Sequence, residues 1–151
     1  MVEIETTSLL LCRLADEPHA LLMSDVREVI RWRVPTPIPG SPETILGVIH
    51  HRGVVLPVVD LRPLLGLDTP PPKRSTRLLI VEHGGLEAAL VSDAVVDIVE
   101  IEQSAVEPVP ASLTAAQARF LAGLVYWAEQ PVALLTLATL FAALTVDHAA
   151  G

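Results

Sequence analysis

The chain carries two weakly similar copies of one pattern, and this duplication constrains its fold more than any other feature. Residues 47–65, GVIHHRGVVLPVVDLRPLL, match residues 123–141, GLVYWAEQPVALLTLATLF, at an offset of 76. A second match, between residues 20–30 and 88–98, has an offset of 68. The difference of 8 places extra loop in the second half, between residues 103 and 119. A duplicated unit predicts two similar subdomains with a seam between them.

Composition limits the class of protein. A chain of 151 residues fits one domain, or two small subdomains that share a core. Hydrophobic residues make up 51% and aromatic residues only 3%, so the core is built from Val, Leu, Ile and Ala. The net charge of -8 argues against nucleic-acid binding, which needs a basic face. The single cysteine, Cys12, excludes an internal disulfide and fits a reducing compartment.

No segment has the pattern of a targeting or membrane-spanning element. The N-terminal MVEIETT is acidic, unlike a signal peptide. The longest apolar stretch, residues 132–146, is shorter than the ~20 residues that span a bilayer. We therefore expect a cytoplasmic protein.

Turn signals recur about every ten residues between short apolar segments, which favours small β-barrels. Gly53 supplies the positive φ of a tight hairpin turn. The proline-rich DTPPPKRS, residues 68–75, predicts a linker between subdomains at residues 1–67 and 76–144, followed by a tail at 145–151. A helix is expected over 137–144, which is rich in Ala and Leu. The expected strands are residues 9–14, 20–23, 26–34, 47–52, 54–61, 78–81, 87–91, 95–101, 122–127 and 132–135.

The sequence of residues 47–62 resembles the signature of the CheW-like domain. It contains a Gly-Val pair, an Arg-Gly turn, an apolar strand with one proline, and an Asp-Leu-Arg ending. Upstream, SDVREVI at residues 24–30 is similar to the family's strand after the first hairpin. The resemblance covers nearly the whole chain. It implies a mainly β fold over residues 1–151, in which two pseudo-symmetric five-stranded SH3-like barrels share a hydrophobic centre, with short helices and a C-terminal helix.

The same resemblance implies a non-catalytic adaptor in bacterial chemosensory signal transduction. CheW-like proteins couple the cytoplasmic tips of chemoreceptors, the methyl-accepting chemotaxis proteins, to the regulatory domain of the histidine kinase CheA. Such a protein is cytoplasmic and joins membrane-associated receptor arrays through its partners, without nucleic acid and without direct membrane insertion. A variant of this hypothesis assigns the chain to a pathway that controls pili, gliding or a second messenger instead of flagellar motility.

The motif also implies which residues contact a receptor between the barrels. The expected receptor-binding residues are Val26, Glu28, Gly47, His50, Arg52 and Gly53. Kinase contacts are implied on the outer strands of both barrels, with no residue assigned. Many relatives have asparagine at the position of His50, so an imidazole beside Arg52 predicts an altered choice of receptor.

Each of these residues also has an internal interpretation. Arg52 always carries a charge and offers five donors, so it could bind an acidic receptor helix or pair with Asp60 or Glu28 and fix the hairpin. Both roles are compatible, because an internally held arginine is pre-organised for a partner. Val26 is interpreted as open to the groove, and Ile30 as barrel core. Trp32 and Trp127 are expected to close the barrel ends.

Catalytic and metal-binding patterns are missing from the sequence. Adjacent strand residues point to opposite faces, so His50 and His51 do not both ligate one ion. The sequence has no phosphate-binding loop, nucleophile elbow or zinc-binding helix motif. We therefore expect no enzymatic activity, no metal and no cofactor. The alternative hypothesis is a small-molecule- or metal-binding β-barrel domain or enzyme that uses His50, His51, Arg52 and Asp60.

Overall fold

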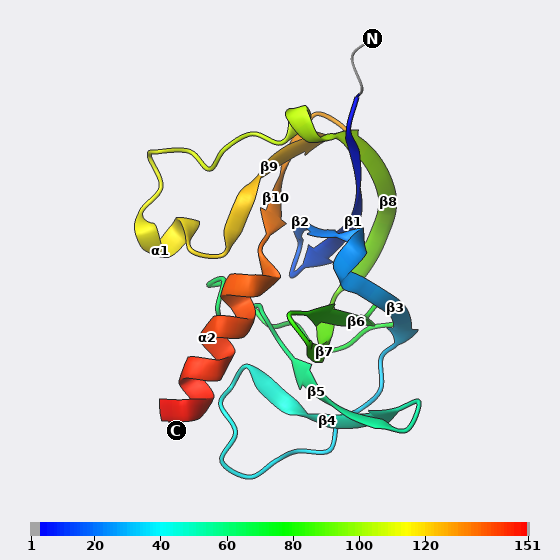
Figure 1. Cartoon of the computed structure of the whole chain (residues 1–151). Coiled ribbons are helices and arrows are strands. Elements are labelled where there is room, and N and C mark those ends of the chain that lie inside the picture. Colours follow the sequence, from blue (N-terminus) through cyan, green and yellow to red (C-terminus); the bar gives the residue numbers. More distant parts are fainter. Residues whose placement is uncertain (1–3, 151) are drawn as a thin grey trace.

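Ten strands and four helices form in the part of the chain that the structure describes (Figure 1). The computed structural model describes the backbone of residues 4–150 and the side chains of residues 4–116 and 118–144. The first five strands are β1 (Thr6–Leu14), β2 (Glu17–Leu22), β3 (Val26–Arg31), β4 (Ile45–His51) and β5 (Val54–Val59). The next five are β6 (Arg77–His83), β7 (Leu86–Ser92), β8 (Ala94–Glu102), β9 (Leu121–Trp127) and β10 (Gln130–Leu135). The helices are η1 (Met23–Asp25), η2 (Gln103–Ala105), α1 (Ala115–Ala118) and α2 (Leu137–Ala150).

All ten expected strands form, and the fold class is the expected one of two five-stranded barrels with a C-terminal helix. The extra loop of the second half is also where the offsets placed it, since η2 and α1 lie between β8 and β9. Helix α2 is longer than predicted. It continues to Ala150 and takes up most of the segment expected as a tail, while residue 151 lies outside the described residues.

The two sheets exchange strands between the copies of the repeat. One sheet has the order β8-β1-β2-β10-β9 and the other β3-β6-β7-β5-β4. We take β1–β5 and β6–β10 as the two copies. One barrel then combines β1 and β2 of the first copy with β8, β9 and β10 of the second. The other barrel combines β6 and β7 of the second copy with β3, β4 and β5 of the first. The expected division into barrels at residues 1–67 and 76–144 is therefore wrong. Figure 1 shows the result, with β2 beside β10 in the upper half of the molecule and β7 beside β5 in the lower half.

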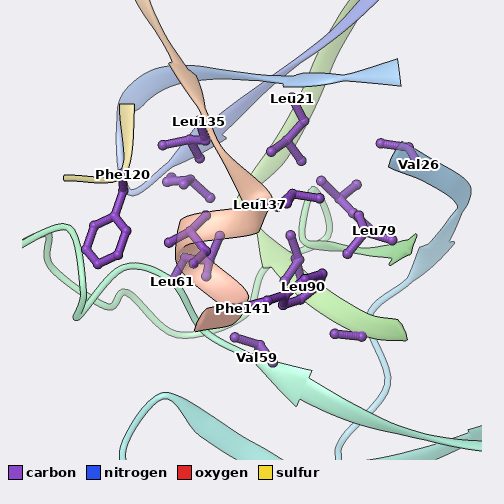
Figure 2. Close-up of a cluster of buried hydrophobic side chains, with 14 of the residues drawn as sticks. Leu21, Val26, Val59, Leu61, Leu79, Leu90, Phe120, Leu135, Leu137 and Phe141 are labelled. Atoms are coloured by element: carbon purple, nitrogen blue, oxygen red, sulfur yellow. The ribbon is translucent and has the colours of Figure 1, made fainter. Parts of the chain in front are cut away.

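A large apolar cluster fills the seam between the barrels (Figure 2). It combines Leu21 of β2 and Leu79 of β6 with Leu137 and Phe141 of α2, so both barrels and the helix contribute. Complete burial of each such side chain stabilises the fold by about 1.5–3 kcal/mol. Because both barrels bury residues in the same cluster, neither has a complete core of its own.

A smaller cluster fills each barrel. Trp32 packs against one cluster and Trp127 against the other, and each is partly buried. That they close the barrel ends stays a prediction. Ile30 also packs against its barrel cluster, as expected. Each barrel therefore contains one tryptophan.

Strand β5 is buried only in its second half, although an unbroken apolar run such as VVLPVV is typical of a strand that is buried on both faces. Val54 and Val55 are 47% and 51% exposed, whereas Val58 and Val59 are buried. The reason is that β5 pairs with β7 only at Val58 and Val59, so its first half has a neighbour on one side alone. Pro57 lies opposite Val48, whose N–H and carbonyl oxygen bond to Thr36, so the missing N–H of Pro57 costs no hydrogen bond to β4.

A buried ion network follows β5. The Arg62 guanidinium donates to both carboxylate oxygens of Asp60, at 2.9 Å each, and to Asp93 Oδ1 at 2.9 Å. It also donates to the Pro70 carbonyl oxygen at 3.1 Å. The Asp93 carboxylate in turn accepts from the Ala15 N–H at 2.5 Å. The network therefore fastens the proline-rich segment and the turn after β1 to the end of β5.

Candidate functional site

The β4–β5 turn presents an arginine at the surface in a backbone conformation that few arginines adopt. His51 pairs with Val54, so Arg52 and Gly53 alone form the turn. Both have positive φ, 51° and 78°, as a type I′ hairpin requires. Glycine adopts this conformation freely, but for arginine it is unfavourable. An unfavourable backbone conformation of this kind persists only where other contacts hold it.

Glu28 of β3 supplies those contacts. Its Oε1 accepts from Arg52 Nη2 at 2.9 Å and its Oε2 from Arg52 Nε at 3.1 Å, a two-point contact that fixes the plane of the guanidinium. The Arg52 side chain is nevertheless 74% exposed. The structure thus confirms one internal interpretation, the pair with Glu28, and leaves the outer face of the guanidinium open to a partner.

His51 and Arg33 extend this cluster. His51 Nε2 lies 2.7 Å from Glu28 Oε2, and its Nδ1 lies 3.3 Å from Arg33 Nη2. The Arg33 guanidinium also donates to the His50 carbonyl oxygen at 2.8 Å. Neither Arg33 nor His51 was among the predicted receptor-binding residues. Their signal in the sequence was weak, because Arg33 lies beyond the end of β3 and its contacts depend on the closure of the barrel.

The charges of the cluster hold Glu28 in its ionised form. Hydrogen bonds from Arg52, and next from His51, lower the pKa of the Glu28 carboxyl from 4.5 to about 2. The same hydrogen bond raises the pKa of the Arg52 guanidinium. The pair is therefore ionised at every physiological pH, and Arg52 is positioned in advance of any binding event.

Two predicted receptor-binding residues lie away from this surface. Val26 is only 8% exposed and belongs to the central apolar cluster, so the expectation that it opens onto a groove is wrong. Gly47 is buried against the backbone of Thr36, with which Val48 forms two hydrogen bonds of 2.8 and 2.9 Å. A Cβ at Gly47 would lie 2.2 Å from the Thr36 carbonyl oxygen. The glycine is thus explained by packing.

The four residues of the alternative hypothesis do not form one site, because only His51 and Arg52 meet, at Glu28. Asp60 is held by Arg62, and Arg52 is held by Glu28. His50 is exposed and lines a separate shallow hollow with Arg33. Within the part of the chain that the structure describes, no three His, Cys, Asp or Glu side chains are grouped closely enough to hold a metal ion.

The turn continues into an exposed apolar surface on β5. Val54 pairs with His51 and lies on the same face of the hairpin as His51, whereas Val55 pairs with His50 on the other face, and about half of each valine is exposed. The cluster thus combines a fixed cation with adjoining apolar area. This combination fits a protein partner, since interfaces combine apolar contacts with a few oriented polar groups. Among the described residues, no helix is long and apolar enough to cross a membrane.

Comparison with known proteins gives consistent results. The family model for the CheW-like domain matches residues 8–145. A probable chemotaxis protein CheW from Rhizobium etli is 30% identical over 129 residues, which cover 85% of this chain and 83% of the relative. The protein FrzA from Myxococcus xanthus is 35% identical over 98 residues, covering 65% and 61%.

A solved structure extends the likeness to the fold. The scaffolding protein TtCheW from Thermoanaerobacter tengcongensis has a TM-score of 0.80 and 30% sequence identity, over 87% of this chain and 90% of that chain. The strand pattern, the arginine–glycine turn and these matches agree. The chain therefore belongs to the CheW-like domain family and is a non-catalytic scaffold protein of chemotaxis-type signalling.

Proposed function

We propose that this protein couples the cytoplasmic tips of chemoreceptors to the regulatory domain of the histidine kinase CheA. The observation that carries the proposal is the exposed Arg52 guanidinium, which Glu28 fixes in the turn between β4 and β5. Membership of the CheW-like family supports the choice of partners. In this role the protein acts in the cytoplasm and reaches membrane-associated arrays through its partners.

The geometry suits a helix as the receptor element. A helical tip can place an acidic side chain or a helix C-terminus against Arg52, whose free N–H groups face outward. Val54, which lies on the same face of the hairpin as His51, would then contact the apolar face of the same helix. Because Glu28 holds the guanidinium before binding, little side-chain entropy is lost when the receptor arrives.

Calorimetric titration tests the proposal directly. The protein is titrated with the regulatory domain of a CheA from the same genome, and separately with a receptor-tip fragment. We expect saturable binding to both, with Kd on the order of micromolar or tighter. Arg52→Ala should weaken receptor-tip binding at least tenfold and leave kinase binding unchanged. Arg119→Ala, which removes an exposed arginine just before β9, is the matched control and should leave both affinities unchanged.

Arg52→Lys separates charge from geometry. Lysine keeps the charge but cannot make the two-point contact with Glu28, so we expect receptor binding between that of the wild type and Arg52→Ala. Absence of binding to every CheA regulatory domain of the genome would overturn the proposal as a whole. Kinase binding together with unchanged receptor binding in Arg52→Ala would overturn only the role of the turn.

A further inference from the structure

Four cations gather around one shallow hollow on the barrel that contains Trp32. Arg31, Lys73, Arg74 and Arg77 line a space of about 640 Å³ together with Trp32 and Thr76. The whole chain has ten Lys and Arg residues and a net charge of -8, so this is a marked concentration of positive charge. None of the ion pairs found in the described part of the chain involves any of the four.

Two of these cations face each other across neighbouring strands. Arg31 of β3 is the direct partner of Arg77 in β6. Like charges directly opposite each other destabilise a sheet unless an anion lies between or above them. The Arg77 guanidinium is held in place by the carbonyl oxygens of Arg74 and Thr76, at 2.7 and 3.0 Å. The fold therefore fixes a repulsive pair whose charge a bound carboxylate would neutralise.

A second, mainly apolar hollow shares two lining residues with the first. It has a volume of about 260 Å³, shares Trp32 and Thr76 with the first hollow, and is also lined by Leu46, Pro71 and Pro72. The buried Asp60–Arg62–Asp93 network forms part of its floor. The two hollows, which have Trp32 and Thr76 in common, are together called here the linker groove, with a basic half and an apolar half.

We propose that the linker groove binds an extended, acidic segment of a partner protein that also carries an apolar side chain. The basic half matches carboxylates, and the apolar half matches the apolar side chain. A free phosphate would leave the apolar half empty. The net charge of -8 disfavours a long polyanion such as nucleic acid, because the rest of the surface repels it. A proline-lined groove needs little ordering to receive an extended peptide.

This groove is separate from the arginine–glycine turn. Successive side chains of a strand alternate between its faces, so Arg31 points to the opposite face of β3 from Glu28. The inference is therefore independent of the proposed receptor contact, and its test requires neither a receptor nor a kinase.

A randomised peptide library displayed on phage provides the first test, because it assumes no partner sequence. The library is selected against the wild-type chain, against Arg31→Glu/Arg74→Glu, and against the control Arg119→Glu. Wild type and control should enrich peptides in which Asp and Glu flank an apolar residue, and the double variant should not. No enrichment on the wild type, or equal enrichment on the double variant, would overturn the proposal.

Titration of one selected peptide provides the second test. In a Trp127→Phe background, Trp32 is the only tryptophan, so its fluorescence reports on the groove. We expect saturable quenching, at least tenfold weaker binding in the Arg31→Glu/Arg74→Glu variant, and a marked loss of affinity as salt is raised. Replacement of the peptide's apolar residue by serine should also weaken binding. Equal affinity for the serine peptide, or displacement of the selected peptide by millimolar pyrophosphate, would show a simple anion site and overturn the peptide assignment.

The variants are chosen so that folding does not obscure the result. Arg31→Glu converts the like-charge pair with Arg77 into an opposite-charge pair, and Arg74 is exposed. We therefore expect the double variant to unfold at or above the wild-type urea midpoint. A lower midpoint would show that the four cations stabilise the fold through contacts of their own, which would also contradict the inference.

Discussion

Two arginines with similar sequence surroundings have opposite roles. Arg52 follows a strand and precedes glycine, and Arg62 follows another strand and precedes proline. The structure buries Arg62 among two carboxylates and a carbonyl oxygen, whereas the Arg52 side chain lies mostly in solvent. Burial thus separates a residue that holds the fold together from one that is available to a partner.

Arg62→Ala should therefore be strongly destabilising. It would leave Asp60 and Asp93 as buried carboxylates without a cation, and removal of one partner from a buried ion pair costs about 3–5 kcal/mol. Urea unfolding monitored by circular dichroism would measure the loss. Arg52→Ala is the control and should change stability far less, because its ion pair is exposed to water. Equal midpoints for the two variants would contradict the structural assignment of Arg62.

The two glycines that open the copies of the repeat make the same kind of contact. A Cβ on Gly47 would lie 2.2 Å from the carbonyl oxygen of Thr36, and a Cβ on Gly123 would lie 2.7 Å from that of Glu107. In both places an incoming loop forms a bridge to the next residue of the strand. The two matched glycines are therefore explained by the close approach of a neighbouring segment to each of them. The sequence repeat shows that the glycines match, but it does not show this reason.

Gly47→Ala should lower the free energy of unfolding by about 2–3 kcal/mol, because the backbone of the incoming loop must move. Gly66→Ala is the matched control. Gly66 also has positive φ, 72°, but a Cβ there meets no atom within 4 Å, so only the backbone preference of about 1–2 kcal/mol is lost. If both variants unfolded at the same urea concentration, the crowding at Gly47 would be refuted.

At the scale of single elements, the hairpins β4–β5 and β9–β10 show what the repeat conserves. Both have a two-residue turn with positive φ at both positions, Arg52-Gly53 in the first and Ala128-Glu129 in the second. The second turn lacks glycine where the first has it. Glu129, at φ 65°, therefore adopts a conformation that disfavours any side chain with a Cβ.

Exchange of the turn residues between the copies provides a prediction. Glu129→Gly should stabilise the protein by about 1 kcal/mol, since glycine removes the steric cost of the left-handed conformation. Gly53→Ala should destabilise it by a similar amount for the converse reason. Thermal unfolding measures both changes. A fall in the unfolding temperature of Glu129→Gly would show that the glutamate side chain makes a stabilising contact.

The elements themselves could be predicted from the sequence because their signals are local. Apolar periodicity, glycines and prolines indicated every strand, and the difference between the two repeat offsets indicated the position of the extra loop. The burial of Val26 could not be read from its own strand, because its neighbours in the central cluster come from distant segments. The Glu28–Arg52 pair was one of two internal alternatives, and only the closure of the barrel decides between Glu28 and Asp60.

At the scale of the whole molecule, sequence similarity identified two copies but assigned them to the wrong barrels. Both copies encode the same five strands, so the pattern does not specify which copy provides the partner of β2 or β7. The structure pairs β2 with β10 and β7 with β5, so that each pair joins strands of different copies. Long-range pairing of this kind depends on chain connectivity and on the shared core, which no local pattern records.

The shared core predicts that the two barrels unfold together. Trp32 belongs to one barrel and Trp127 to the other, so Trp32→Phe and Trp127→Phe each leave one reporter. We expect each variant to show one urea transition, in which tryptophan fluorescence and circular dichroism coincide. If the fluorescence midpoint of either variant lay at a lower urea concentration than its circular-dichroism midpoint, the barrel that holds the remaining tryptophan would unfold separately. That result would contradict a common core.

The exchange of strands also bears on how such a chain could arise. A lone copy of the repeat would possess five strands but could not complete either barrel in the arrangement seen here, because its first hairpin belongs to the other barrel. Two separate copies could complete both barrels only as a reciprocal dimer, whose formation would depend on concentration. Fusion through the segment between β5 and β6 makes that encounter intramolecular, so assembly of the barrels no longer responds to dilution.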